Sequence, residues 1–140
     1  MREYIGLFRG KHPNGMWVYG SLATFRNIKN EPYTAIIPVE DGENQIRRLT
    51  RVDPETVGEC TGLKDKNGKL IFDGDIISCW SEGVNAKGTV QRRVDGLWFI
   101  FPAWQKHIMW GLCPDKYTNT TVEIIGNIYD NPKLVERRED

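Results

Sequence analysis

The stretch VDPETVGECTGLKDKNGKLIFDGDII, residues 52–77, contains in order a proline-containing turn, a Gly-rich reversal, an apolar run and the acidic triplet Asp73-Gly74-Asp75. Its first part, Asp53-Pro54-Glu55-Thr56, has the signature of a helix start: an Asp cap, a proline at the first helical position and an acid in the first turn. Because Gly58 follows closely, this signature predicts only a single short 3₁₀ or α turn.

The second part of the stretch predicts a β-hairpin. Asn67-Gly68 is a pair that tolerates positive φ at both centres of a type I′ turn, and the apolar runs 70–72 and 76–80 resemble strands. Asp73-Gly74-Asp75 lies between these runs and predicts a bend, because Asp and Gly are common turn residues. The two carboxylates could instead share a face and hold a proton or a cation. Since no further ligand motif surrounds them, the bend is the favoured interpretation.

The remainder of the chain also has a β pattern. Short runs of β-branched and aromatic residues are separated by 14 glycines and 7 prolines, as in all-β folds. Pro38 suggests an edge strand, Gly126 a bulge or close packing, and Asp95-Gly96 a two-residue hairpin loop. Further strands are expected at residues 16–25, 33–39, 89–94, 97–101 and 122–128.

Two segments have a different pattern. Residues 45–52 fit a strand or a helix equally well, and residues 131–135 resemble a capped terminal helix. The prediction for the whole is a mostly β chain, mainly strand between residues 70 and 128, with a barrel formed from about residue 60 onward.

Composition and charge limit the class of protein. The chain of 140 residues is 39% hydrophobic and 27% charged, which is ordinary for a soluble globular domain. It has no apolar stretch long enough to span a membrane and no N-terminal secretory pattern, and its three cysteines suit reduced thiols in a cytoplasm. Net charge is zero, although residues 1–52 carry 8 basic and 5 acidic side chains. Nucleic acid is therefore possible as a ligand but not favoured.

Four motifs together resemble the YopX-like proteins, which bacteriophages and prophages encode, commonly in Gram-positive bacteria. They are FRGK with NGMWVYGSL near the N-terminus, the stretch 52–77, GTV with DGLWFI after it, and VEIIGNIYDNP at the end. The resemblance covers nearly the whole chain in the same order, and TGLKDKNGK followed by GDII is its most specific part.

The resemblance implies a fold and no catalytic residues. It implies a mainly β protein with an SH3-like barrel in the C-terminal part and a smaller N-terminal α+β portion. We therefore expect an α+β subdomain over residues 1–59 and a barrel with a helical tail over residues 60–140, together one structural unit. The segment from about residue 40 to 51 departs from the family pattern, so its conformation is not predicted.

Motifs for catalysis, metal or phosphate are weak. Two histidines and three cysteines could in principle bind zinc or form a Cys–His pair, but their spacing is not that of a zinc site, and buried or idle side chains are favoured. The glycine- and lysine-rich GLKDKNGK resembles a phosphate loop but lacks the GxxxxGK[ST] order. We expect no cofactor, no metal and no enzyme. The zinc candidates are His12, Cys60, Cys79, His107 and Cys113.

Aromatic residues between positions 80 and 110 are the strongest candidates for a binding site. Large rings on a small barrel are expected in the core, but alternation along residues 97–101 places Trp98 and Ile100 on the opposite face from Leu97, Phe99 and Phe101. Any outward ring, flanked by basic residues, could contact a protein or stack on bases. The candidate binding residues are Arg92, Arg93, Trp98, Trp104 and Trp110.

Two functions of different class remain open. The first is a non-catalytic binding or adaptor protein that contacts a protein partner or copies of itself, and the zero net charge favours it. The second is a nucleic-acid-associated small barrel acting in phage DNA or RNA metabolism. Short strands leave sheet edges that identical chains can cover, so we also expect a homo-oligomer with Trp98 or Trp104 near a subunit contact.

Overall fold

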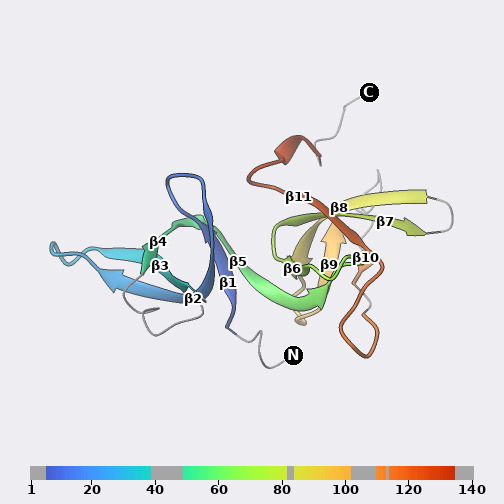
Figure 1. Cartoon of the computed structure of the whole chain (residues 1–140), viewed down its shortest axis with the longest axis horizontal. Helices are drawn as coiled ribbons and strands as arrows, with labels where there is room; N and C mark the ends of the chain where they lie inside the picture. The colour runs from blue at the N-terminus through green and yellow to red at the C-terminus, as the bar shows by residue number, and fades with distance from the viewer. Residues whose placement is uncertain (1–5, 39–48, 82–83, 102–109, 113, 135–140) are drawn as a thin grey trace. The chain divides into compact units, whose positions relative to one another are not determined.

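The computed structural model is mainly β and describes residues 6–38, 49–81, 84–101, 110–112 and 114–134 (Figure 1). Within these ranges the regular helix is one 3₁₀ turn, η3 (Pro132–Leu134). No helix in the described ranges is long and apolar enough to cross a membrane. The strands are β1 (Phe8–Lys11), β2 (Trp17–Arg26), β3 (Pro32–Pro38), β4 (Thr50–Arg51), β5 (Asp53–Lys64), β6 (Leu70–Phe72), β7 (Asp75–Ser81), β8 (Val84–Arg92), β9 (Trp98–Phe101), β10 (Trp110–Gly111) and β11 (Glu123–Asn127).

The chain divides into two compact units, Arg2–Cys60 and Thr61–Asp140, with Met1 assigned to the second. The six-stranded sheet has the order β4-β3-β2-β1-β5-β6. Strand β5 begins in the first unit, where it pairs with β1, and ends in the second. Because the regular structure of the described residues is almost all strand, the prediction of a mainly β fold is confirmed.

In the N-terminal unit, the core lies where β1 approaches the segment after β4. Ile36 and Val52 are buried there. A Cβ on Gly10 would lie 2.8 Å from Val52 Cγ2 and 3.2 Å from Ile36 Cδ1. Only glycine allows this close approach, which explains the glycine within FRGK.

The C-terminal unit contains a five-stranded antiparallel sheet in the order β10-β9-β8-β7-β11. Side chains from this sheet, from β6, from the end of β5 and from the residue before β11 form one hydrophobic cluster, and alternate residues of each strand point to the same side. The cluster comprises Leu63, Ile71, Ile77, Cys79, Ala86, Val90, Ile100 and Val122.

Five reversals in the chain share one turn pattern. In each, the N–H of the fourth residue donates to the carbonyl of the first, and the first and fifth residues are hydrogen-bonded through their backbones. The fourth residue has positive φ. This pattern is that of a type I turn followed by a left-handed residue, which forms a bulge. The five turns are His12–Met16, Asn27–Glu31, Asp65–Lys69, Arg93–Leu97 and Asp115–Asn119.

The type I′ prediction for Asn67-Gly68 and the two-residue loop predicted for Asp95-Gly96 are therefore wrong in detail. Both hairpins form where predicted, but only Gly68 and Gly96 have positive φ, at 81° and 92°, while the residues before them do not. A type I′ turn needs positive φ at both centres, so the longer loop forms instead.

The predicted helical turn at Asp53-Pro54-Glu55-Thr56 is also wrong, because these residues belong to β5. Arg9 of β1 pairs with Gly58, and Lys11 pairs with Asp53. Between these two pairs β5 contains more residues than β1, so the register shifts in a bulge. Thr56 Oγ1 accepts from the N–H of Lys11 at 2.8 Å and donates to the carbonyl of Asp53 at 2.6 Å. The pairing with β1 thus competes successfully with the helix signal, and proline is tolerated at a bulge.

Other expectations have mixed outcomes. Pro38 does not mark an edge strand, since β3 lies between β2 and β4, but the described β4 pairs only with Ala35 and Ile36. Gly126 does mark a bulge against β7, and a Cβ there would lie 2.5 Å from Asn131 Oδ1. The terminal helix is reduced to η3.

The described residues of the N-terminal unit contain strands and no helix, so the helical part of the expected α+β portion is not seen there. Residues 39–48, which include most of the ambiguous segment 45–52, lie outside the described residues. The rest of that segment contains the short strand β4.

Candidate functional site

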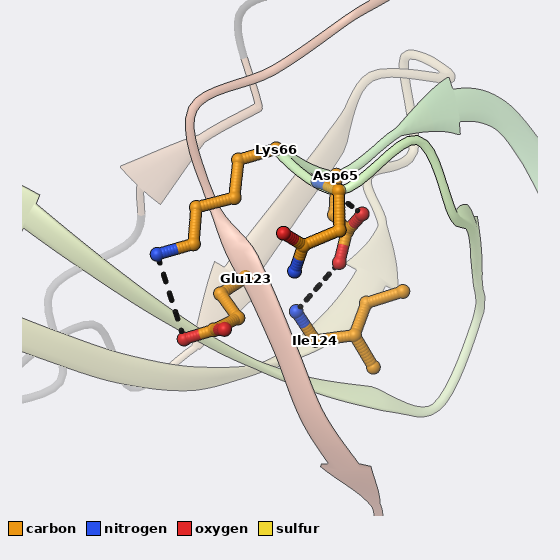
Figure 2. Close-up of polar contacts among 5 residues, drawn as sticks. Asp65, Lys66, Glu123 and Ile124 are labelled. Carbon is orange, nitrogen blue, oxygen red and sulfur yellow. Dashed lines mark hydrogen bonds and ion pairs between the residues drawn. The ribbon is translucent and has the colours of Figure 1, made fainter.

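The motif TGLKDKNGK is organised by one buried carboxylate, Asp65, which is 2% exposed. Its Oδ1 accepts from the backbone N–H groups of Asn67 and Lys69, each at 2.9 Å. Its Oδ2 accepts from the N–H of Ile124 on β11 at 3.2 Å, as Figure 2 shows. One side chain therefore closes the β5–β6 hairpin and fastens it to a strand about 60 residues away in the chain.

The backbone around Asp65 reinforces this connection. The backbone N–H of Lys64 donates to the carbonyl of Thr118, and the backbone N–H of Lys66 donates to that of Val122. The carbonyl of Lys64 accepts from both the N–H and the Oγ1 of Thr120. Figure 2 also shows the surface ion pair of Lys66 with Glu123, at 3.7 Å. A phosphate loop must offer free backbone N–H groups to an anion. Here the Asp65 carboxylate occupies such groups, so the motif serves to hold the fold together.

Asp73-Gly74-Asp75 forms the bend that the sequence predicts. Gly74 has φ of 92°, its N–H donates to Val90 and its carbonyl accepts from Ile128. Asp75 is 2% exposed, and its Oδ2 accepts from the N–H of Phe72 at 2.7 Å. This carboxylate is directed back at the chain that precedes the bend, where it stabilises the turn.

The thiols are in apolar surroundings. Cys60 and Cys79 are buried free cysteines, and burial raises the pKa of the Cys79 thiol. A raised pKa favours the neutral thiol, which is a poor nucleophile and a poor metal ligand. Among the described residues, no group of three or more His, Cys, Asp or Glu side chains is placed to bind a metal. His107 and Cys113 lie outside the described residues.

The β8–β9 hairpin brings together three of the predicted binding residues. The Arg92 guanidinium lies over the Trp98 ring, 5.7 Å from its centroid, and Arg93 forms an ion pair with Asp95 at 3.2 Å. Arg92, Arg93, Val94, Asp95 and Phe99 line an open hollow of about 490 Å³. Cationic and apolar surface are therefore adjacent at this hairpin.

The alternation along β9 shows which side of Trp98 is covered. Ile100, on the same face, is buried, and Trp98 is half-buried and packs against the hydrophobic cluster. The opposite face is more open, since Leu97 is 60% exposed. Trp110 pairs with Ile100 at the start of β10, and Trp104 lies outside the described residues.

A second set of aromatic and basic side chains, which the sequence analysis did not single out, lies on one face of the N-terminal sheet. Its rings come from β2 and β3 and its cations from β1 and β4. Residues 9–19 alone contain Arg9, Lys11, Trp17 and Tyr19, whereas Tyr33 and Arg51 join the set only through strand pairing. We call it the aromatic face; it comprises Arg9, Lys11, Trp17, Tyr19, Phe25, Tyr33 and Arg51.

Comparison with known proteins gives the family. Residues 7–136 match the family model described as YopX protein. The chain belongs to the YopX family. A solved structure, protein EF1440 from Enterococcus faecalis, is similar with a TM-score of 0.52 and 21% sequence identity, covering 93% of this chain and 97% of that chain. At this identity the likeness shows a common fold alone. A comparison with curated proteins found no match.

Within the residues that match the family, the segment 61–77 has a structural role. TGLKDKNGK and GDII contain the two buried carboxylates Asp65 and Asp75, and both accept hydrogen bonds from backbone N–H groups. The hairpin hollow and the aromatic face lie on other strands. Among the residues that the structure describes, these two surfaces are the candidate binding sites of this YopX chain.

Proposed function

We propose that this protein is a non-catalytic binding module of a bacteriophage or prophage, acting through protein–protein contacts. The observation that carries the proposal is the tip of the β8–β9 hairpin, where Val94 is fully exposed, Leu97 is 60% exposed, and Arg92 lines the same hollow as Val94. The five-stranded antiparallel sheet supports an SH3-like barrel for the C-terminal unit, on whose surface this hairpin would lie.

The chemistry of the hairpin suits a protein partner. Apolar side chains next to a hollow can anchor a partner's hydrophobic residue, and arginine is enriched at the energetic centres of interfaces. Arg92 is held by stacking on Trp98, so less side-chain freedom is lost on binding. A partner segment with an apolar anchor next to an acidic side chain fits this arrangement.

The absence of catalysis is part of the proposal. The buried carboxylates of Asp65 and Asp75 accept backbone hydrogen bonds, and the Cys79 thiol is shifted toward its neutral form. A catalytic acid, base or nucleophile would instead face a pocket with convergent polar groups. These side chains are used for the fold, which supports a binding role.

A pull-down with matched variants tests the proposal. The full-length tagged chain would be used to recover proteins from prophage-induced cells, with Val94→Ser and Leu97→Ser combined as the test variant. The control is Ile28→Ser, because Ile28 is fully exposed at the second position of the same type of turn, in the other unit.

We expect the hairpin variant to bind the recovered partner about tenfold more weakly or worse, and Ile28→Ser to bind like the unchanged protein. The partner's affinity is then measured with purified components. Equal affinity for all three proteins, or no partner at all, would contradict the proposal.

A second candidate function is association with nucleic acid in phage DNA or RNA metabolism. The observation that favours it is the aromatic face of the N-terminal unit, where three cations lie over aromatic rings. Steep weakening by salt would distinguish it from a protein interface.

A further inference from the structure

The aromatic face is defined by strand register. Arg9 lies opposite Tyr19 and Lys11 opposite Trp17 in the β1–β2 pair. Residues directly opposite each other on antiparallel strands share a face, as do alternate residues along one strand. The β1–β2 end of the face therefore presents two cations and two rings together.

The β2–β3 pair continues the same face toward the other end of β2. Phe25 lies opposite Tyr33, with ring centroids 6.1 Å apart. Arg51 on β4 lies opposite Ala35, and its guanidinium is 5.3 Å from the centroid of the Tyr33 ring. Six residues separate Tyr19 from Phe25 along β2, a span of roughly 20 Å at the rise of a β-strand.

Each of the three cations of the aromatic face lies against an aromatic ring. The guanidinium of Arg9 is 4.8 Å from the Trp17 centroid and the Nζ of Lys11 is 5.9 Å from it. Arg9 is buried, whereas Arg51 is exposed and Tyr19 is 43% exposed. A planar guanidinium and an aromatic ring both stack on a flat ligand.

Charge indicates which flat ligand. The N-terminal unit as a whole is neutral, with 8 basic and 8 acidic side chains between Arg2 and Cys60, but three of its cations, Arg9, Lys11 and Arg51, lie on the aromatic face. The acid placed opposite Lys11 is Asp53, and its Oδ1 accepts from the N–H of Glu55. A ligand that joins π-faces to regularly spaced negative charges is complementary to this surface.

We infer that the aromatic face of the N-terminal sheet binds single-stranded nucleic acid. Bases stack on Tyr19 and Tyr33, and the phosphates lie near Lys11 and Arg51. Stacking of this kind tolerates any sequence, because every base has a π-face. The inference deepens the second candidate function and does not depend on the protein contacts of the β8–β9 hairpin.

The experiment is fluorescence anisotropy with the full chain and labelled single-stranded DNA and RNA of roughly 20 nucleotides, a length that exceeds a typical single-domain site. Each variant changes one exposed position. Tyr19→Ser removes a stacking ring and Arg51→Gln removes a stacked cation. A duplex of the same DNA sequence is the third probe.

Each test variant has a control on the opposite face of the same sheet. Leu22→Ser removes a partly exposed apolar side chain from β2, three residues from Tyr19, and Arg26→Gln removes a charge at the end of the same strand. Odd and even positions of β2 point to opposite sides, so neither control touches the aromatic face.

We expect single strands to bind more tightly than the duplex, and Tyr19→Ser to weaken binding by about fivefold or more. Two phosphate contacts, from Lys11 and Arg51, give a salt slope of about −1.4, which is roughly a sevenfold loss between about 50 and 200 mM salt, and Arg51→Gln should reduce that slope by about 0.7. The two control variants should bind like the unchanged protein. Comparison of the labelled DNA with the labelled RNA shows which nucleic acid the protein prefers.

The inference would be overturned by no binding of either single strand, by equal binding of the duplex, or by binding unaffected by Tyr19→Ser and Arg51→Gln. Circular dichroism of each variant shows whether it is folded, and the conservative variants Tyr19→Phe and Arg51→Lys, which keep the ring and the charge, should retain most of the binding. Binding that the hairpin variant Leu97→Ser abolishes, with the aromatic-face variants unaffected, would also overturn it and would place the ligand on the hairpin.

Discussion

At the scale of single residues, side-chain oxygens replace backbone partners where the chain reverses. Asn27, Asp65 and Asp115 each begin a turn, and each accepts two backbone N–H bonds, from the second and fourth residues after it. Only Asp65 among the three is buried and has a further bond to another strand. The same local device therefore has a tertiary role at one of its three positions.

That difference gives a prediction with an internal control. Asp65→Ala leaves three backbone N–H groups without their acceptor in a buried site, so we expect a loss of about 2–4 kcal/mol in the free energy of unfolding. Asp115→Ala removes the same two turn bonds at an exposed position, where water can replace them, and should cost about 1 kcal/mol or less. Chemical denaturation measures both, and equal losses would contradict a tertiary role for Asp65.

A second prediction concerns the bend between β6 and β7. Asp75→Asn keeps an oxygen that can accept from the N–H of Phe72, so folding and binding should be nearly unchanged. Gly74→Val places a β-branched residue at φ of 92° and should cost well over about 1 kcal/mol in stability. Thermal denaturation and binding assays measure these effects. A folded Asp75→Asn protein without activity would instead show that the carboxylate has a functional role.

At the scale of elements, the five turns differ mainly in the residue that takes the left-handed conformation. Three use glycine, one uses Asn30 at φ of 62° and one uses Thr118 at φ of 68°. Glycine adopts this conformation without steric cost and asparagine with little, but a β-branched threonine is strained there. The Asp115–Asn119 turn is thus the least favourable of the five.

We therefore predict that Thr118→Gly stabilises the protein by about 0.5–1 kcal/mol, because relief of strain exceeds the added freedom of the unfolded chain. Asn30→Gly, the matched change in the Asn27–Glu31 turn, should have a smaller effect or none. Midpoints of urea denaturation measure both. Destabilisation by Thr118→Gly would show that the threonine side chain makes a compensating contact.

The turns also show how far sequence predicts the elements. The positions of the hairpins could be predicted because Gly68 and Gly96 need positive φ in either kind of turn. The class of turn could not be predicted. It depends on the conformation of the residue before the glycine, and Asn and Asp can adopt the conformation that either class of turn requires. The Asp53-Pro54 signal failed for a related reason: local capping is weak, and pairing of β5 with β1 decides the conformation.

At the scale of the whole molecule, candidate sites were predictable only where their residues are close in sequence. Arg92 and Trp98 are six positions apart, so the hairpin surface was expected. Lys11 and Trp17 are also six positions apart, so this end of the aromatic face could have been recognised, whereas Tyr33 and Arg51 come together only through the pairing of β3 with β4. Surfaces built across strands need the sheet topology first.

The last prediction is self-association, which the exposed β8–β9 hairpin makes testable. Trp98 packs partly against the core, so the apolar surface left for a second copy is that of Val94 and Leu97, next to Trp98. Covering such a patch between identical chains gives closed symmetric assemblies, and we expect a homo-oligomer at micromolar concentration. Leu97→Ser should shift it toward the monomer, whereas Ile28→Ser, at an equally exposed turn of the other unit, should not. Sedimentation decides the matter, because a single species near 16.1 kDa at every concentration would contradict the prediction.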